Sequence, residues 1–296
     1  MYNPRLSIFL RAAETGSFNR AAEELFLSAP ALIKQINALE NELAIRLFDR
    51  SHQGLKLTKA GESLYRDAKY IIQYSKASVR RAQEAMQEEE HIVRLGASPM
   101  TPPNFLLELW PKIHAACPSI KFQLVPFENT PENAQGILRH LGLDIDVVAG
   151  LFDDRMLSLY PGCAAFKLSF EPFCCAVSLN SPLASKERLS LQDLYGQKFL
   201  IIRKGWSEYV DAMREELMEK HPEILLEEFP FYNLRVFNEC ENGNHLLLAI
   251  RKWEQVHPLL KILPVEWEFG MPFGLLHAEE PSEAVQCLLD TVRDIL

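Results

Sequence analysis

Residues 17–50 read SFNRAAEELFLSAPALIKQINALENELAIRLFDR, a pattern that predicts two short amphipathic helices joined by a tight turn at residues 25–27. Ser17 and Ser28 stand where the two helices begin. A serine hydroxyl at that position accepts a hydrogen bond from a backbone N–H that has no partner within the helix. Pro30 falls in the first turn of the second helix, where its missing N–H costs little.

Each of the two predicted helices has one apolar face. The second helix carries its apolar residues at the spacing of a 3.6-residue repeat, and they are Leu32, Ile36, Leu39 and Leu43. The first helix is expected to bury Ala21, Ala22 and Leu25. The other face of the second helix presents small, amide and cationic residues near its N-terminus, namely Ser28, Ala29, Lys34 and Asn37. This is the arrangement of a helix-turn-helix recognition helix, whose first residues meet base edges in the major groove.

The residues around this stretch extend the pattern from Leu6 to Gly61. The features that follow in order and at fixed spacing are Phe9, Gly16-Ser17-Phe18, Arg20-Ala21-Ala22, Leu25, Ser28, Pro30-Ala31-Leu32, Gln35-Ile36, Leu39-Glu40, Leu43, Leu47-Phe48, Arg50, Leu57-Thr58 and Ala60-Gly61. Together they make the segment resemble the N-terminal domain of the LysR-type transcriptional regulators.

The resemblance implies a multidomain α+β protein. Residues 1–58 would form a winged helix-turn-helix domain, residues 59–90 a long linker and dimerisation helix with a hinge, and residues 91–296 an effector-binding domain like that of periplasmic binding proteins. Two α/β lobes are expected in the last of these, lobe I at about 91–163 and 265–296 and lobe II at about 164–264. The chain would cross between them near Cys163 and Pro264.

Two further helices are expected around the helix-turn-helix. Leu6, Phe9, Leu10 and Ala13 mark the apolar face of a first helix that ends before Gly16. Thr58 caps a helix that runs to about Gln87, well beyond the average length of about 11–12 residues. In the resembled family this helix pairs with its twin, and two-fold pairing presents two recognition helices to half-sites about 34 Å apart.

A small hairpin at residues 50–57 is the expected wing, because Gly54 can supply the positive φ of a tight turn. Its Arg50, His52 and Lys56 could form a solvated loop, but beside a recognition helix their donors are better placed for phosphate oxygens. The predicted DNA-binding residues are Ser17, Asn19, Arg20, Ser28, Ala29, Pro30, Lys34, Gln35, Asn37, Arg50, His52 and Lys56.

The net charge of −9 is divided unevenly along the chain. Residues 1–87 hold 13 Lys and Arg against 9 Asp and Glu, a net of +4, and the remainder holds 18 against 31, a net of −13. The cationic part is therefore the helix-turn-helix part, as the neutralisation of phosphates requires. The acidic remainder argues against a non-specific polyanion binder.

From residue 92 onward, predicted strands alternate with predicted helices, and several strands are apolar on both faces. This indicates a largely parallel sheet covered by helices. Ligands of such sheets bind beyond the carboxyl ends of the strands, beside helix N-termini. The predicted effector-binding residues are Ser98, Thr101, Phe127, Asn129, Gly150, Arg203, Phe231 and Asn233. Ser98 and Thr101 could instead only cap the following helix. Arg203 could bind an anionic effector through a forked pair of hydrogen bonds, or it could be an ordinary surface residue.

The sequence departs from the family at three places. Ala29 stands where the family usually has glutamine in Ser-Gln-Pro-Ala, and a methyl group can contact only a thymine methyl or a sugar. Ile33 replaces a usual serine or threonine. The stretch Asn242-Gly243-Asn244-His245 keeps one of two common glycines. We therefore expect an atypical operator and a more polar cleft wall, so the resemblance does not assign a standard effector class.

Two other functions are weighed. An enzyme or transport-type binding protein on the same fold is disfavoured, because no Gly-rich phosphate loop, metal-ligand spacing or nucleophile elbow is present. A redox sensor would use lobe II cysteines, but a sensor thiol is exposed and has a lowered pKa, whereas Cys174 and Cys175 fall within an apolar strand. The cysteines that could approach one another in lobe II are Cys163, Cys174, Cys175 and Cys240.

The first ten residues hold no extended apolar run, and no apolar stretch approaches the roughly 20 residues that span a bilayer. A cytoplasmic protein is expected, with six cysteines as reduced thiols. No cofactor or metal is expected. The partners that the resemblance implies are double-stranded promoter DNA, a small-molecule effector, a second copy of the chain in a homodimer or homotetramer, and RNA polymerase as a further candidate.

Overall fold

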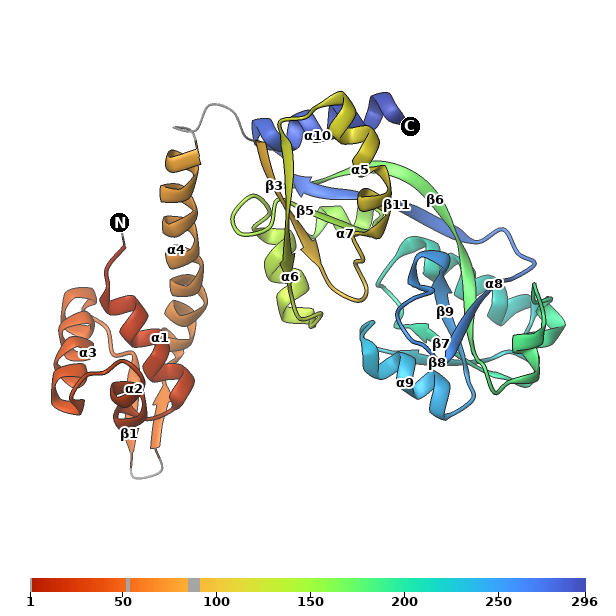
Figure 1. The fold of residues 1–296 in the computed structure, drawn as a ribbon. Helices are drawn as coiled ribbons and strands as arrows, with labels where there is room; N and C mark the ends of the chain where they lie inside the picture. The colour runs from red at the N-terminus through yellow and green to blue at the C-terminus, as the bar shows by residue number, and fades with distance from the viewer. Residues whose placement is uncertain (1, 52–53, 85–90) are drawn as a thin grey trace. The chain divides into compact units, whose positions relative to one another are not determined.

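The computed structural model describes residues 2–51, 54–84 and 91–296. The chain forms two compact units, Met1–Glu88 and Glu89–Leu296, here called the N-terminal and C-terminal units. Figure 1 shows the first unit as helices around a small hairpin and the second as a sheet flanked by helices. In the described residues, no helix is both long enough and apolar enough to cross a membrane.

The N-terminal unit is a winged helix-turn-helix followed by a long helix. Its elements are α1 (Arg5–Thr15), α2 (Phe18–Glu24), α3 (Ala29–Leu43), β1 (Phe48–Ser51), β2 (Gly54–Leu57) and α4 (Lys59–Glu84). The three predicted caps are confirmed. Ser17 Oγ accepts from the backbone N–H of Arg20, Ser28 Oγ from that of Ala31 at 3.3 Å, and Thr58 Oγ1 from that of Gly61 at 3.0 Å.

The core of this unit contains most of the predicted apolar positions. Its buried residues are Leu6, Phe9, Ala12, Ala21, Ala22, Leu32, Ile36, Leu39, Leu47, Phe48, Ala68 and Ile72. Leu43 was expected among them but is 40% exposed. The helix ends there, because Ala44 takes a left-handed conformation with φ 55°, and Glu40 is buried in the last turn instead.

The wing is confirmed as an antiparallel hairpin that begins two residues earlier than predicted. Phe48 pairs with Leu57 at its base, and Ser51 pairs with Gly54 at its tip. Gly54 is therefore the first residue of β2 rather than a residue of the turn. Residues 52–53, which include the predicted contact residue His52, lie outside the described part of the chain.

The C-terminal unit alternates strands and helices as predicted, with additional elements. Its larger elements are β3 (His91–Ala97), α5 (Asn104–Ala116), β4 (Ile120–Pro126), α6 (Pro131–Arg139), β5 (Val147–Leu151), α7 (Asp154–Ser158), β6 (Cys163–Ser178), β7 (Lys198–Ile202), α8 (Glu208–Lys220), β8 (Leu225–Phe229), α9 (Leu234–Asn242), β9 (Leu246–Ile250), β10 (Leu260–Pro264), β11 (Gly270–Ala278) and α10 (Glu283–Ile295). Three short 3₁₀ helices complete the set, η1 (Pro182–Ser185), η2 (Leu191–Leu194) and η3 (Arg251–Trp253).

One mixed sheet runs through the unit in the order β4-β3-β5-β11-β6-β9-β7-β8, with β10 paired to β6. The outer strands of each half are parallel, as predicted: β3 pairs with β4 and β5, and β7 pairs with β8 and β9. The central strands β6, β10 and β11 are antiparallel to their neighbours. The expectation of a largely parallel sheet thus holds for the outer strands of each half. It does not hold for the centre, where the chain passes from one half to the other and back.

The two predicted lobes share the long strand β6, the green ribbon that arches between them in Figure 1. Its first part pairs with β11 as far as Pro172, and its second part pairs with β9 from Phe173. The first crossing therefore lies near Phe173 rather than near Cys163. One uninterrupted strand makes the crossing, so no turn signal marks it in the sequence.

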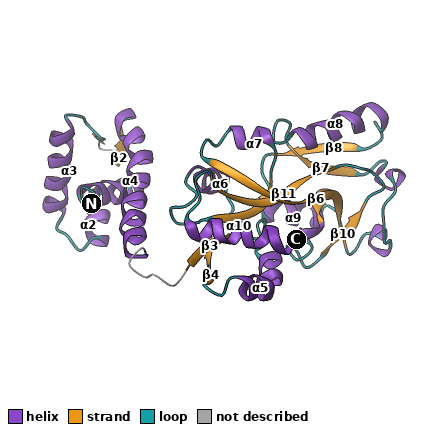
Figure 2. Ribbon diagram, turned by 90° about the horizontal axis from the view of Figure 1, so that it is seen from above, coloured by secondary structure: helices purple, strands orange, loops and turns teal. Residues whose placement is uncertain are grey.

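The lobe I part of the sheet is covered on both faces. Val147 and Ala149 of β5 join the cluster that contains α5 and α10, and Val148 joins the cluster that contains α6. This alternation is the period of a strand whose two faces are both buried. Helices α5 and α10 pack against each other, as Figures 1 and 2 show.

Candidate functional site

The residues predicted to bind DNA lie mainly on α2, α3 and the wing. Seven are exposed, and they are Asn19, Arg20, Ser28, Pro30, Lys34, Asn37 and Lys56. Ser17 and Ala29 are half-buried beside them. Arg50 lies on β1, and its side chain is outside the described part. The first turn of α3 holds no acidic residue. No carboxylate of this turn therefore offsets the positive end of the helix dipole, which favours a phosphate group nearby.

Gln35 differs from the other predicted contacts. Its Oε1 accepts a hydrogen bond from Arg5 Nε at 3.0 Å, and Arg5 Nη1 also pairs with Glu42 at 2.8 Å. The amide of Gln35 thus ties α3 to α1 and is occupied there. Its position along the helix gave no sign of this contact, because the partner lies 30 residues earlier.

A cavity of about 530 Å³ opens between the two lobes of the C-terminal unit. It lies beyond the carboxyl ends of β3, β4 and β5 on one side and of β7, β8 and β9 on the other. Seven of the eight predicted effector residues line it, and they are Thr101, Phe127, Asn129, Gly150, Arg203, Phe231 and Asn233. Ser98 does not; its Oγ lies 2.8 Å from Thr101 Oγ1 and holds the turn after β3.

The lining of this cavity is mainly apolar. Among the described residues around it, Arg203 alone carries a charge, and its side chain is exposed. Thr101, Asn129, Gln135 and Asn233 add uncharged polar groups. An apolar cavity of this size with a few polar groups is typical of a small-molecule site. Because none of its described lining residues carries a carboxylate, the cavity favours a neutral or anionic ligand.

Several lining residues were missed by the sequence, and aromatic ones stand out. Trp206, Tyr232 and Trp253 form a chain of rings on the lobe II side, with Tyr232 centred 6.1 Å from Trp206 and 4.7 Å from Trp253. Burial raises the pKa of Tyr232, whose hydroxyl donates to the carbonyl of Leu248. Each ring follows a lobe II strand by a few residues. The carboxyl-end rule gave Arg203 after β7 and the neighbours of Tyr232 after β8, but it was not applied to β9, which Trp253 follows.

Hydrogen bonds join the two lobes at the cavity. Asn129 Nδ2 donates to the carbonyl of Tyr232 at 2.8 Å, and Trp253 Nε1 donates to the carbonyl of Met100 at 3.0 Å. Asp153 contributes a third link, since its Oδ1 caps α7 and its Oδ2 accepts from the backbone N–H of Glu208 at 2.9 Å. Groups that line the cavity therefore also hold the lobes together.

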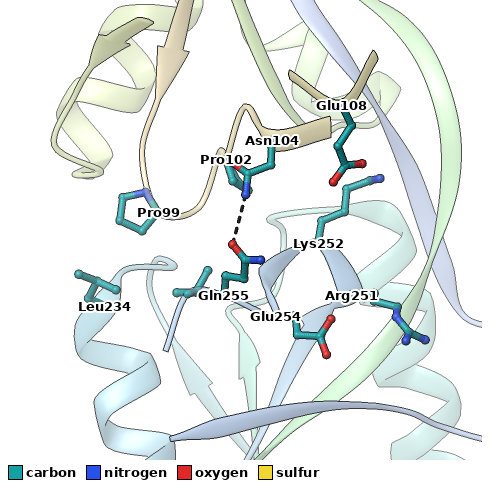
Figure 3. A pocket seen from close by; sticks show the side chains of 10 residues that line it. Pro99, Pro102, Asn104, Glu108, Leu234, Arg251, Lys252, Glu254 and Gln255 are labelled. Carbon is teal, nitrogen blue, oxygen red and sulfur yellow. Dashed lines mark hydrogen bonds between the residues drawn. The ribbon is translucent and has the colours of Figure 1, made fainter. Parts of the chain in front are cut away.

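A second, more polar cavity of about 500 Å³ is lined by other residues, including Pro99, Asn104 and Gln255, and Figure 3 shows it. Two of its lining residues are hydrogen-bonded to each other, since Asn104 Nδ2 donates to Gln255 Oε1 at 3.3 Å. Its charged lining residues are of both signs, namely Glu108, Arg251, Lys252 and Glu254. Because these charges are balanced and largely open to solvent, the cavity favours no ligand class, and the first cavity remains the candidate effector site.

Two family models match the chain. The helix-turn-helix model described as a bacterial regulatory protein of the lysR family matches residues 4–62, and the LysR substrate-binding domain model matches residues 86–227. The chain belongs to the LysR-type regulators. The two matched regions contain the candidate DNA-binding surface and the lobe I side of the cavity.

Among similar LysR-type proteins is the hydrogen peroxide-inducible genes activator of Dickeya chrysanthemi, 28% identical over 68% of this chain and 63% of that protein. The Hca operon transcriptional activator HcaR of Escherichia coli is 29% identical over 66% of this chain and 63% of that protein. The match thus spans less than two-thirds of these relatives. The crystal structure of CbnR, a LysR family regulator, has the same fold, with a TM-score of 0.75 at 19% identity over 99% of both chains. CbnR bound to its target DNA gives a TM-score of 0.74 at 20% identity, with both chains fully covered.

The four cysteines considered for redox sensing lack the properties of sensor thiols, and Cys163 lies in lobe I, where β6 pairs with β11. Burial raises the pKa of Cys163 and Cys174 to about 11, that of Cys240 to about 12, and that of Cys175 well above its usual value. A thiol with a raised pKa stays protonated and reacts slowly. No group of His, Cys, Asp or Glu in the described residues is arranged to hold a metal ion.

Proposed function

We propose that this protein is a DNA-binding transcriptional regulator that binds promoter DNA as a dimer or tetramer and responds to a small molecule in the cavity between its lobes. The observation that carries the DNA-binding part is the N-terminal end of α3, which is exposed, free of acidic residues in its first turn and flanked by Lys34. A cytoplasmic location and the absence of enzymatic activity follow from this role, and RNA polymerase is a further candidate partner.

Removal of the Lys34 ammonium is expected to weaken DNA binding in a way that salt reveals. If Lys34 neutralises a phosphate, Lys34→Ala should lower affinity for all sequences about equally and should reduce the slope of log K against log salt by about 1 per chain bound. Electrophoretic mobility shift or fluorescence anisotropy at several salt concentrations measures this slope. Lys220→Ala, an exposed lysine change on α8, is the matched control and should leave the slope unchanged. An unchanged slope for Lys34→Ala would remove Lys34 from the interface.

A dimer through α4 is part of the proposal. Ile71, Tyr74 and Val79 are between 40% and 48% exposed on this helix. If a second copy of the chain covers this apolar side of α4, the resulting dimer presents two recognition helices to two half-sites. These side chains support the pairing expected from the length of the helix.

The chemistry of the cavity points to the kind of effector. A ligand there would place an apolar or aromatic body against Phe127, Ile137 and Trp206 and an acceptor or anionic group toward Arg203. The guanidinium of arginine matches a carboxylate through two parallel hydrogen bonds. Such a ligand would shift the equilibrium between lobe arrangements to the extent that it binds one of them better. The Asn129–Tyr232 and Met100–Trp253 hydrogen bonds join the two lobes, so a change in the lobe arrangement would alter them.

Filling the cavity is expected to abolish effector binding without unfolding the protein. A Cβ atom on Gly150 would meet Leu276 Cδ1 at 3.8 Å, an ordinary contact, so a side chain there fits the backbone and enters the cavity. Gly150→Leu should therefore lose the thermal stabilisation that small aromatic and aliphatic carboxylates give the wild type in differential scanning fluorimetry. Gly136→Leu is the control, because a Cβ on this α6 residue meets no atom within 4 Å and Gly136 does not line the cavity. Equal ligand response in Gly150→Leu and the wild type would place the effector elsewhere.

A further inference from the structure

Two cysteines from distant parts of the sequence meet in lobe I. Cys117 follows the last residue of α5, and Cys287 lies in the first half of α10. Their Sγ atoms are 3.0 Å apart, although 170 residues separate them along the chain. Both side chains are half-buried, so a small solute can reach them. The lobe II cysteines Cys174, Cys175 and Cys240, in contrast, are buried.

The surroundings of the pair give the two sulfur atoms different roles. Cys287 and Ser119 hydrogen-bond to the sulfur of Cys117 and lower the pKa of that thiol. Burial, together with the same hydrogen bond, raises the pKa of Cys287 to about 11. Cys117 therefore loses its proton more readily than Cys287, whose thiol lies within hydrogen-bond distance of the Cys117 sulfur. A partly exposed cysteine with a lowered pKa next to a second cysteine is the arrangement in which oxidation ends in a disulfide.

The scaffold allows the bond to form with little movement. A disulfide has an S–S length of about 2.05 Å, so the two sulfur atoms must approach by roughly 1 Å. Cys117 lies in the turn between α5 and β4 rather than inside a helix, with φ −139° and ψ 84°. A small rotation of its side chain is therefore not opposed by a regular helix.

The pair is separate from the cavity between the lobes. The cavity lies at the carboxyl ends of the lobe I strands, whereas Cys117 precedes the first residue of β4 by three positions. That residue, Ile120, pairs with His91, the first residue of β3. The cysteine pair is thus at the opposite end of these strands, beside the point where the chain enters the C-terminal unit.

We propose that Cys117 and Cys287 form a reversible, peroxide-generated disulfide that fastens the end of α5 to α10, an oxidation site of lobe I distinct from the effector cavity. The Cys117 thiolate attacks one oxygen of a hydroperoxide, which breaks the O–O bond and gives a sulfenic acid and hydroxide. The Cys287 sulfur then attacks the sulfenic sulfur, the S–S bond forms, and water leaves. In total, two thiols and one hydrogen peroxide give one disulfide and two waters. A dithiol reductant reverses the bond by exchange.

The test uses the full chain treated with one equivalent of hydrogen peroxide, alkylated, digested without reductant and analysed by mass spectrometry. The expected product is an intrachain peptide pair that joins Cys117 to Cys287, with a loss of two free thiols. Cys287→Ser should stop at a sulfenic acid on Cys117, which dimedone labels, and Cys117→Ser should retain a free Cys287. Cys163→Ser is the control, because Cys163 begins β6 outside the pair; it should form the bond as the wild type does.

A second readout is the unfolding temperature. Because the bond closes a loop of about 170 residues, oxidised wild type should unfold roughly 5–10 °C higher than the reduced form and should return on addition of dithiothreitol. Neither serine variant of the pair should show this rise. Crosslinks between chains, bonds among other cysteines, over-oxidation of Cys117 without a crosslink, or an equal thermal shift in Cys287→Ser would each overturn the proposal.

Discussion

Asp146→Ala is expected to lower the free energy of unfolding of the C-terminal unit by about 3–5 kcal/mol, because it leaves a buried guanidinium without its carboxylate. Arg94 and Asp146 are only 6% and 3% exposed. Arg94 Nε and Nη2 donate to the two carboxylate oxygens at 2.8 and 2.6 Å, and the backbone N–H of Arg94 donates to Oδ2 at 2.8 Å.

This ion pair also positions the cavity. The backbone N–H of Asp146 donates to the carbonyl of Arg94 at 2.9 Å, so the residue is bound to β3 through both side chain and main chain. Strand β5 begins at the next residue and leads to Gly150 at the cavity wall. Loss of Asp146 therefore frees the start of the strand that carries part of the effector site.

Urea or thermal unfolding of the variant measures the effect. Asp144→Ala, an exposed change two residues away, should cost much less. The double variant Arg94→Met and Asp146→Leu should recover a large part of the loss, because apolar residues of similar volume replace both charges. A loss below about 1 kcal/mol in Asp146→Ala would mean that the pair contributes no more than a surface ion pair does.

The second large effect is expected at Glu40, whose Oε1 accepts hydrogen bonds from the backbone N–H groups of Leu47 at 2.7 Å and Phe48 at 3.2 Å. Glu40→Ala should destabilise the N-terminal unit by about 2–4 kcal/mol, because two N–H groups near the base of the wing lose a charged, buried acceptor. Glu40 is 8% exposed, so water replaces the carboxylate poorly. DNA binding should fall with stability, since the link between α3 and the wing is lost.

Comparison of Glu40→Gln with Glu40→Ala separates the role of Glu40 as a hydrogen-bond acceptor from the effect of its negative charge. The glutamine oxygen can still accept both hydrogen bonds, so Glu40→Gln should retain most of the stability measured by thermal unfolding. Glu23→Ala removes an exposed carboxylate on α2 and should be close to neutral. Equal losses in the glutamine and alanine variants would contradict the hydrogen-bonding account.

The helix-turn-helix could be predicted from the sequence because its signals are local. Caps at Ser17, Ser28 and Thr58 and the periodic apolar residues of α3 lie within one helix length of the features that they define. Leu43 was wrongly predicted to be buried, and the reason lies in contacts outside its own helix. The buried position in the last turn is taken by Glu40, whose partners belong to the segment that follows the helix.

The C-terminal unit was predictable in its alternation of strands and helices and in residues on both sides of its cavity. The rule that ligands bind beyond the carboxyl ends of parallel strands brought Thr101, Asn129, Gly150 and Arg203 to one cavity. Their role in binding stays a prediction. Strand β6 has a continuous apolar run only in its second half, because Pro172 and the polar residues before it interrupt the run.

Contacts over long sequence distances could not be found by spacing. The Cys117–Cys287 contact and the Arg5–Gln35 hydrogen bond join residues on different elements, and no local pattern encodes either. The cysteine hypothesis drawn from the sequence placed the thiols of interest in lobe II, where they are closer together in the chain. The structure instead brings the closest described pair together in lobe I.

The most direct test of the central claim is selection of binding sites from a random pool of double-stranded DNA with the full chain, followed by titration of the recovered sites at several salt concentrations. A LysR-type dimer that reads DNA through α3 predicts enriched sites with two-fold symmetry and half-sites about one helical turn, roughly 34 Å, apart. Affinity for these sites should exceed that for random DNA by at least about 10³-fold and should fall as salt rises. Recovery of no enriched motif, or equal affinity for selected and random DNA at every salt concentration, would contradict the account.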